Sequence, residues 1–189
     1  KNYSIIKNAY FVGINHIETA PSYGDAESLI GNSIKKLAIE ENIKEKNWVI
    51  TSKVLPKGDF DFLKNNFKKS LKNLNREKIN NLAFHGLNLK QHLDWVLSGE
   101  GKKFISWILE KELVDQVGFS SHGSYSLIKD AINCEVFTFC SLHLHYLDQS
   151  KIALAEEAIK KGMGVLAISP ADKGGRLYSP SNILIEASK

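Results

Sequence analysis

The sequence has few of the features that mark secreted or membrane-embedded proteins. It contains only two cysteines in 189 residues, too few for a disulfide framework, so we expect Cys134 and Cys140 to be small core residues in a reducing cytoplasm. Its apolar stretches are far shorter than the roughly 20 residues that span a bilayer. The N-terminus also lacks the apolar centre of a signal peptide. The sequence therefore predicts a cytoplasmic protein without a membrane partner.

Basic charge is present but dispersed. The formal net charge is +4, and the lysines form no run interleaved with aromatic residues, so no nucleic-acid partner is expected. The apolar fraction of 43% and the charged fraction of 24% are typical of globular proteins. No low-complexity or linker-like segment interrupts the chain. These observations predict a single domain over residues 1–189.

Two kinds of apolar segment alternate along the chain. Segments typical of strands lie near residues 15–20, 47–53, 79–85, 114–120, 136–143 and 164–169. Amphipathic segments typical of helices lie near residues 3–12, 26–40, 60–75, 91–112, 124–132 and 149–162. Strands separated by helices of this size form parallel sheets with right-handed crossovers, which is an α/β fold. Alternation alone leaves an open doubly wound sheet and a barrel equally possible.

Ionisable side chains follow three successive predicted strands. Glu18 lies at the end of the first and Tyr23 in the loop after it, Lys53 ends the second and His85 ends the third. In parallel α/β folds the ligands bind beyond the carboxyl ends of the strands. Each residue alone has an ordinary structural explanation, but four such groups at three strand ends predict a catalytic site.

Residues 13–31 resemble the signature G-x-N-x-x-D-T-A-x-x-Y-G-x-[AS]-E-x-x-[IL]-G of the aldo-keto reductases. The similarity continues through T-S-K at 51–53, S-L-K-N-L at 70–74, H-G at 85–86, G-F-S-S at 118–121 and I-S-P at 168–170. Segments 141–145 and 172–181 look like a bacterial branch of predicted oxidoreductases. Six motifs in the expected order make the resemblance specific, and it covers almost the whole chain.

The resemblance implies a (β/α)8 TIM barrel. Such barrels usually need about 250 residues, and this sequence of 189 residues offers six strands. We therefore expect an incomplete barrel of about six strands in which the first and last strands are missing.

The resemblance also implies a reaction, the reduction of a small aldehyde or ketone to an alcohol with NADPH or NADH. The catalytic residues of the family match Tyr23, Lys53, His85 and Glu18. A phenol with a pKa of about 10 is a weak acid at neutral pH, so Lys53 is expected to assist Tyr23 as the general acid. His85 would orient the substrate oxygen. Glu18 stands where the family usually has aspartate.

The resemblance places the cofactor along the later strands. Ser120 and Ser121 match a serine–asparagine pair that binds the nicotinamide carboxamide, and Ile168 falls where the family has a ring-stacking tyrosine. The remaining candidates lie beside this pair or in the loop expected over the pyrophosphate, where glycines expose backbone amides. They are Ser141, Ser169, Lys173, Gly174, Gly175 and Arg176.

Two other functions remain open. Glu18, Ser121 and Ile168 depart from the family pattern, which suggests a non-catalytic or regulatory barrel that binds the cofactor. His122, His143 and His145 suggest a metal site instead. His143 and His145 lie two residues apart on one strand and thus share a face, as in zinc-dependent barrel hydrolases. Because no carboxylate motif at another strand end completes a ligand set, we predict no metal site. The particular substrate and the oligomeric state are not predicted.

Overall fold

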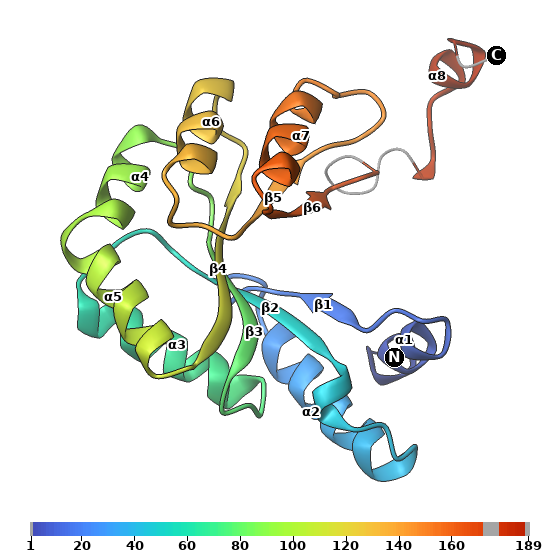
Figure 1. Cartoon of the computed structure of the whole chain (residues 1–189). Coiled ribbons are helices and arrows are strands. Elements are labelled where there is room, and N and C mark those ends of the chain that lie inside the picture. Colours follow the sequence, from blue (N-terminus) through green and yellow to red (C-terminus); the bar gives the residue numbers. More distant parts are fainter. Residues whose placement is uncertain (1, 172–177, 188–189) are drawn as a thin grey trace.

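A curved parallel sheet organises the protein (Figure 1). The computed structural model describes residues 2–171 and 178–187. The described residues contain six strands: β1 (His16–Glu18), β2 (Val49–Val54), β3 (Ile79–Phe84), β4 (Val114–Ser121), β5 (Phe139–His143) and β6 (Gly164–Ile168). Their α-helices are α1 (Asn2–Phe11), α2 (Ala26–Glu40), α3 (Phe60–Asn73), α4 (Lys90–Leu97), α5 (Gly99–Glu110), α6 (Tyr125–Asn133), α7 (Ile152–Lys160) and α8 (Asn182–Ala187), and a 3₁₀ turn covers Glu45–Asn47. None of these helices is both long and apolar enough to cross a membrane.

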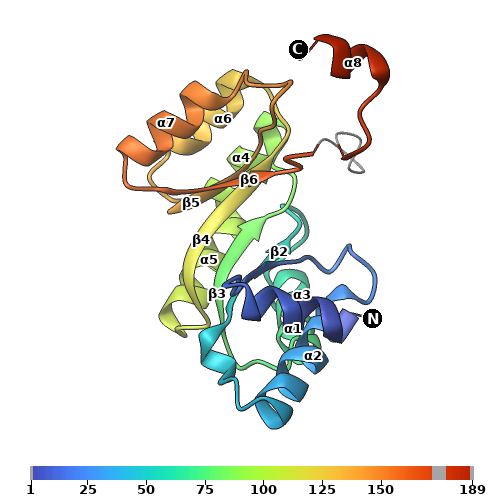
Figure 2. The same cartoon turned by 90° about the vertical axis from the view of Figure 1, so that its right-hand side faces the viewer.

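The strands follow one another across the sheet in chain order, from β1 to β6. Every neighbouring pair is parallel, so all six carboxyl ends lie along one edge. The sheet curls around its concave side, with α2 to α7 covering the convex side (Figures 1 and 2). This arrangement is an incomplete (β/α)8 barrel. The predicted α/β class, the parallel pairing and the six strands are confirmed.

The hydrophobic core lies between the convex side of the sheet and its helices. Leu63, Phe67 and Leu71 form the buried stripe of α3, as the periodicity predicts. Phe67 packs edge-to-face against Phe104 of α5, with ring centroids 6.1 Å apart. The helix starts at its N-cap Asp59, whose carboxylate accepts a hydrogen bond from Phe62 N at 2.8 Å.

Polar side chains occupy part of the concave side. His16 Nε2 lies 2.8 Å from Thr51 Oγ1, and Asn81 Nδ2 donates to the same hydroxyl at 2.9 Å. Closed barrels usually fill this space with bulky branched side chains. Burial lowers the pKa of His16, an effect that neighbouring Glu18 opposes, so the imidazole is neutral at pH 7.

The segment 91–112, predicted as one helix, forms two. The first, α4, ends at Leu97, and Ser98 adopts an extended backbone with φ of −130° and ψ of 169°. Gly99 follows with φ of +44°, a conformation that favours glycine. Gly101 then lets α5 pass close to α4, because a Cβ there would lie 2.6 Å from Trp95 O. The apolar periodicity continues across this break and hides it.

Candidate active site

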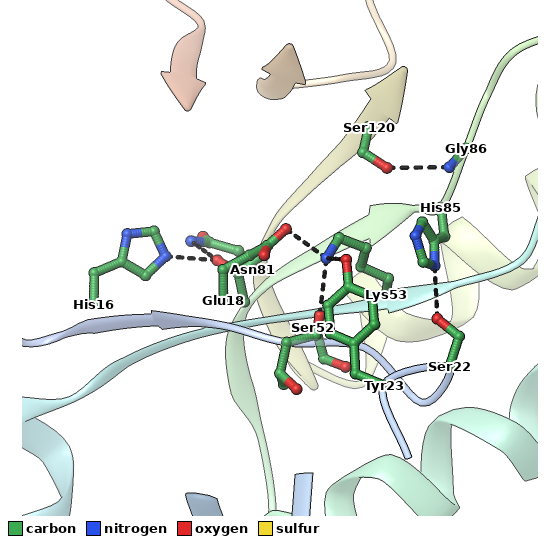
Figure 3. A network of polar contacts seen from close by, with 12 residues as sticks. His16, Glu18, Ser22, Tyr23, Ser52, Lys53, Asn81, His85, Gly86 and Ser120 are labelled. Atoms are coloured by element: carbon green, nitrogen blue, oxygen red, sulfur yellow. Dashed lines mark hydrogen bonds and ion pairs between the residues drawn. The ribbon is translucent and has the colours of Figure 1, made fainter. Parts of the chain in front are cut away.

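Tyr23 lies in a tight loop between β1 and α2. Its backbone N–H donates to Ala20 O at 3.0 Å, and its carbonyl accepts from Ala26 N at 3.2 Å. Gly24 follows with φ of +61°. These turns aim the phenol across the carboxyl end of β2 toward Lys53, as Figure 3 shows, while the side chain stays 48% exposed.

Lys53 lies on β2 with only 2% of its surface exposed. Its ammonium donates to the Tyr23 hydroxyl at 3.0 Å and to Thr19 O at 3.1 Å. It also forms an ion pair with the carboxylate of Glu18 at the end of β1 (Figure 3). Three acceptors therefore surround a buried cation, which is the environment that a buried ammonium requires.

His85 follows β3 and completes the group. Its Nδ1 lies 3.3 Å from Ser22 Oγ, and its ring meets that of Tyr23 edge-to-face with centroids 5.7 Å apart. Burial lowers the pKa of His85, and the nearby Lys53 ammonium lowers it further against the opposing effect of Glu18. The imidazole is therefore neutral at pH 7.

A cavity of about 480 Å³ opens at this edge of the sheet. The four residues predicted to be catalytic all contribute to its lining: Glu18, Tyr23, Lys53 and His85. The rest of the lining comes from Gly86, Asn88, Ser120, His122, Leu166, Ala167, Ile168 and Ser169. The structure thus brings residues from both edge strands, β1 and β6, to one cavity.

Several residues predicted to bind the cofactor lie along this cavity. Ser120, Ile168 and Ser169 line it, and Ser120 Oγ accepts a hydrogen bond from Gly86 N at 3.1 Å. Ser141 pairs in register with Ser120 on one side and Leu166 on the other. Ser141 does not itself contribute to the cavity lining, and its hydroxyl is buried without a hydrogen-bond partner among the described residues.

Ser121 has a different environment. Its hydroxyl donates to Leu87 O at 2.6 Å and accepts from Gly123 N at 2.9 Å, and it does not contribute to the cavity lining. This hydroxyl therefore holds the loop that follows β3. The other predicted phosphate-side residues, Lys173, Gly174, Gly175 and Arg176, lie outside the described residues.

The three histidines considered for a metal site are neighbours. The His122 and His143 ring centroids are 5.2 Å apart, and those of His143 and His145 are 4.9 Å apart. Within residues 2–171 and 178–187, no group of three or more histidine, cysteine or acidic residues is arranged to hold a metal ion. The metal-dependent hydrolase gains no support from the described residues.

Sequence reasoning missed several contributors to the site. Asn88 lines the cavity and accepts a hydrogen bond from His122 N at 2.7 Å. Ser22 contacts His85, and the Thr19 carbonyl contacts Lys53. Thr19 and Ser22 lie inside the 13–31 motif, so proximity to Tyr23 was an available signal. For Asn88 the sequence carried no signal.

Known proteins resemble the chain in both sequence and structure. The model of the aldo/keto reductase family matches residues 1–180. A curated aldose reductase from Encephalitozoon cuniculi is 29% identical in an alignment 180 residues long, and this alignment covers 87% of this chain and 58% of that protein. The chain thus spans just under three-fifths of the length of this relative.

Solved structures share the fold. The enzyme MGS-M4, an aldo-keto reductase from a Medee basin deep-sea metagenome library, superimposes with a TM-score of 0.76 and 21% identity, covering 100% of this chain and 67% of that one. The aldo-keto reductase AKR2E5 of the silkworm Bombyx mori, solved as a complex with NADPH, gives a TM-score of 0.74 and 21% identity over 88% of this chain and 52% of that one. With the family model matching nearly the whole sequence, this chain belongs to the aldo/keto reductase family.

Proposed function

We propose that the protein is a NAD(P)H-dependent oxidoreductase that reduces a small aldehyde or ketone to an alcohol. One observation carries this proposal: the Tyr23 hydroxyl lies 3.0 Å from the buried ammonium of Lys53, at the mouth of a cavity. Carbonyl reduction needs a proton donor at the substrate oxygen, and a phenol beside a cation is suited to that role.

Tyr23 donates its proton to the carbonyl oxygen. The phenolate that results is stabilised by the Lys53 ammonium, since a nearby opposite charge favours the ionised form. Glu18 balances the charge of Lys53 and, with Thr19 O, fixes the direction of the ammonium. Tyr23 thus acts as the general acid, with Lys53 and Glu18 supporting it.

His85 orients the substrate oxygen. Because its imidazole is neutral and Nδ1 faces Ser22 Oγ, we assign Nδ1 as the acceptor and the Nε2–H group as the donor. A hydrogen bond from Nε2 would hold the carbonyl oxygen near Tyr23. A neutral donor suits this position next to an ammonium, because a second positive charge would be repelled.

Residues along β4 to β6 would hold the cofactor. The Ser141 hydroxyl lies next to Ser120 in the sheet and has no hydrogen-bond partner among the described residues, so it fits a carboxamide, which both donates and accepts hydrogen bonds. When bound, a reduced nicotinamide supplies the hydride that the carbonyl carbon accepts. NADPH is the proposed cofactor because the silkworm relative is solved with it, and NADH is the alternative. Lys173 and Arg176 would contact the phosphates.

A panel of short aldehydes and ketones, with NADPH absorbance as the readout, tests the proposal. We expect NADPH consumption in proportion to alcohol formed, and NADPH binding that is independent of the carbonyl compound. Binding without consumption across the panel would refute the reductase and leave the regulatory cofactor-binding barrel as the function. If NADPH is neither bound nor consumed, both the reductase and the regulatory cofactor-binding barrel are excluded.

The remaining proposals concern the whole chain. We propose that residues 1–189 behave as one domain that acts in the cytoplasm on a small-molecule carbonyl substrate, without a nucleic-acid or membrane partner. A single cooperative unfolding transition in urea is expected for one domain. Two separate transitions would contradict it.

A further inference from the structure

A buried carboxylate lies directly behind the catalytic group and has no part in the chemistry proposed above. Glu27, in the first turn of α2, is 2% exposed. Its Oε1 accepts a hydrogen bond from Ser52 Oγ at 2.7 Å, and its Oε2 accepts from Asn73 Nδ2 at 3.3 Å. No cationic side chain pairs with it within the described parts of the chain. Such burial of an acid is costly and calls for a specific role.

The two partners of Glu27 come from different elements. Ser52 belongs to β2 and is 0% exposed, and Asn73 is the last residue of α3. The first half of α2 approaches the end of α3 closely at Gly31, where a Cβ would lie 2.6 Å from Asn73 O. One carboxylate therefore ties the start of α2 to the sheet and to the neighbouring helix.

Chain connectivity links this contact to the catalytic pair. Ser52 immediately precedes Lys53 on β2, and because strand side chains alternate, the two point to opposite sides of the sheet. Glu27 lies four residues beyond Tyr23, and the Ala26 N to Tyr23 O hydrogen bond joins the start of α2 to the loop. Figure 3 shows Ser52 beneath the sheet next to the Tyr23–Lys53 contact.

We propose that Glu27 is a positioning residue that holds the Tyr23 hydroxyl at hydrogen-bond distance from the Lys53 ammonium. The Glu27–Ser52 hydrogen bond fixes the start of α2 against β2, and the loop carries that constraint to Tyr23. Because Tyr23 lies on a half-exposed loop, the Glu27–Ser52 hydrogen bond restricts the positions that its hydroxyl can take. The proposal rests on the proposed reductase function, but the placement of Tyr23 can be measured without turnover.

The variants Glu27→Ala and Ser52→Ala break the contact from either side, and Glu27→Gln replaces the carboxylate with a carboxamide of the same size, whose oxygen can still accept the hydrogen bond from Ser52. Ser33→Ala is the matched control, because Ser33 is also buried on α2 and its hydroxyl bonds within the helix, to Leu29 O at 2.7 Å. The first readout is the ring NMR signal of Tyr23, assigned with Tyr23→Phe. It reports the surroundings of the phenol.

We expect the Tyr23 signal to shift in Glu27→Ala and Ser52→Ala, to return toward the wild-type position in Glu27→Gln and to stay unchanged in Ser33→Ala. In turnover, kcat should fall about 10- to 100-fold in the two breaking variants, since small misplacements at a reacting centre have effects of this size, while KM and NADPH affinity stay within about twofold.

An unchanged Tyr23 signal in Ser52→Ala, with or without a lower melting temperature, would overturn the proposal and leave Glu27 a purely structural residue. Ser52→Ala removes only one hydroxyl, so it decides the question even if Glu27→Ala does not fold. If the wild-type chain reduces no carbonyl compound, the reductase proposal fails while the NMR comparison still tests the placement of Tyr23.

Discussion

Replacing Tyr23 by phenylalanine removes a single oxygen atom from the site. The ammonium of Lys53 loses one acceptor at 3.0 Å but keeps Thr19 O and Glu18. The ring is about half exposed, so the free energy of unfolding should change by no more than about 1 kcal/mol. Loss of a general acid lowers turnover by about 10²- to 10⁴-fold, equivalent to about 3–5 kcal/mol in the activation barrier.

The assay compares kcat for a saturating aldehyde, NADPH affinity by fluorescence titration and stability in urea. We expect kcat to fall by the factor above while the other two quantities hold. Tyr125→Phe is the matched control, because Tyr125 is 47% exposed and lies at the start of α6, away from the cavity. A kcat in Tyr23→Phe within about twofold of wild type would refute Tyr23 as the proton donor.

Three further outcomes are expected. Burial lowers the pKa of His85, so this imidazole binds a proton more readily in the unfolded chain than in the folded one. Stability should therefore be retained above about pH 6.5 and decline as the pH falls below it. Melting temperatures measured across this range should decline less steeply in His85→Gln. Gly31→Ala should lower the free energy of unfolding by about 1–3 kcal/mol in urea titrations, because its Cβ would lie 2.6 Å from Asn73 O. In the described part of the chain β1 and β6 each pair on one side only, so sedimentation velocity should show concentration-dependent association.

The strand-end residues could be predicted because parallel topology leaves little freedom. Once strands and helices alternate, the carboxyl ends must share one edge, and side chains at those ends must be neighbours. Glu18, Lys53 and His85 follow this rule directly. Predicting the position of Tyr23 also required the short loop after β1, since Tyr23 lies five residues beyond Glu18 and returns toward β2 through two turn hydrogen bonds.

Contacts made behind the sheet could not be predicted in the same way. The partners of Glu27 depend on how closely α2 and α3 approach, which Gly31 permits but does not specify. The hydroxyl of Ser121 bonds to Leu87 O, a backbone atom whose position depends on the loop conformation after β3. Periodicity reports which face of an element is buried and carries no information on such pairings.

The position of Glu18 explains how a glutamate can stand where aspartate is usual. In the sheet Glu18 pairs in register with Thr51, two residues before Lys53. On the same face of a strand this offset is about 6.6 Å, and the two long side chains cover it, because the ion pair between them forms. The extra methylene therefore preserves the contact that Lys53 needs. Glu18, Ser121 and Ile168 were the three departures from the family pattern that suggested a regulatory barrel. Glu18 is compatible with catalysis, so that alternative now depends on Ser121 and Ile168.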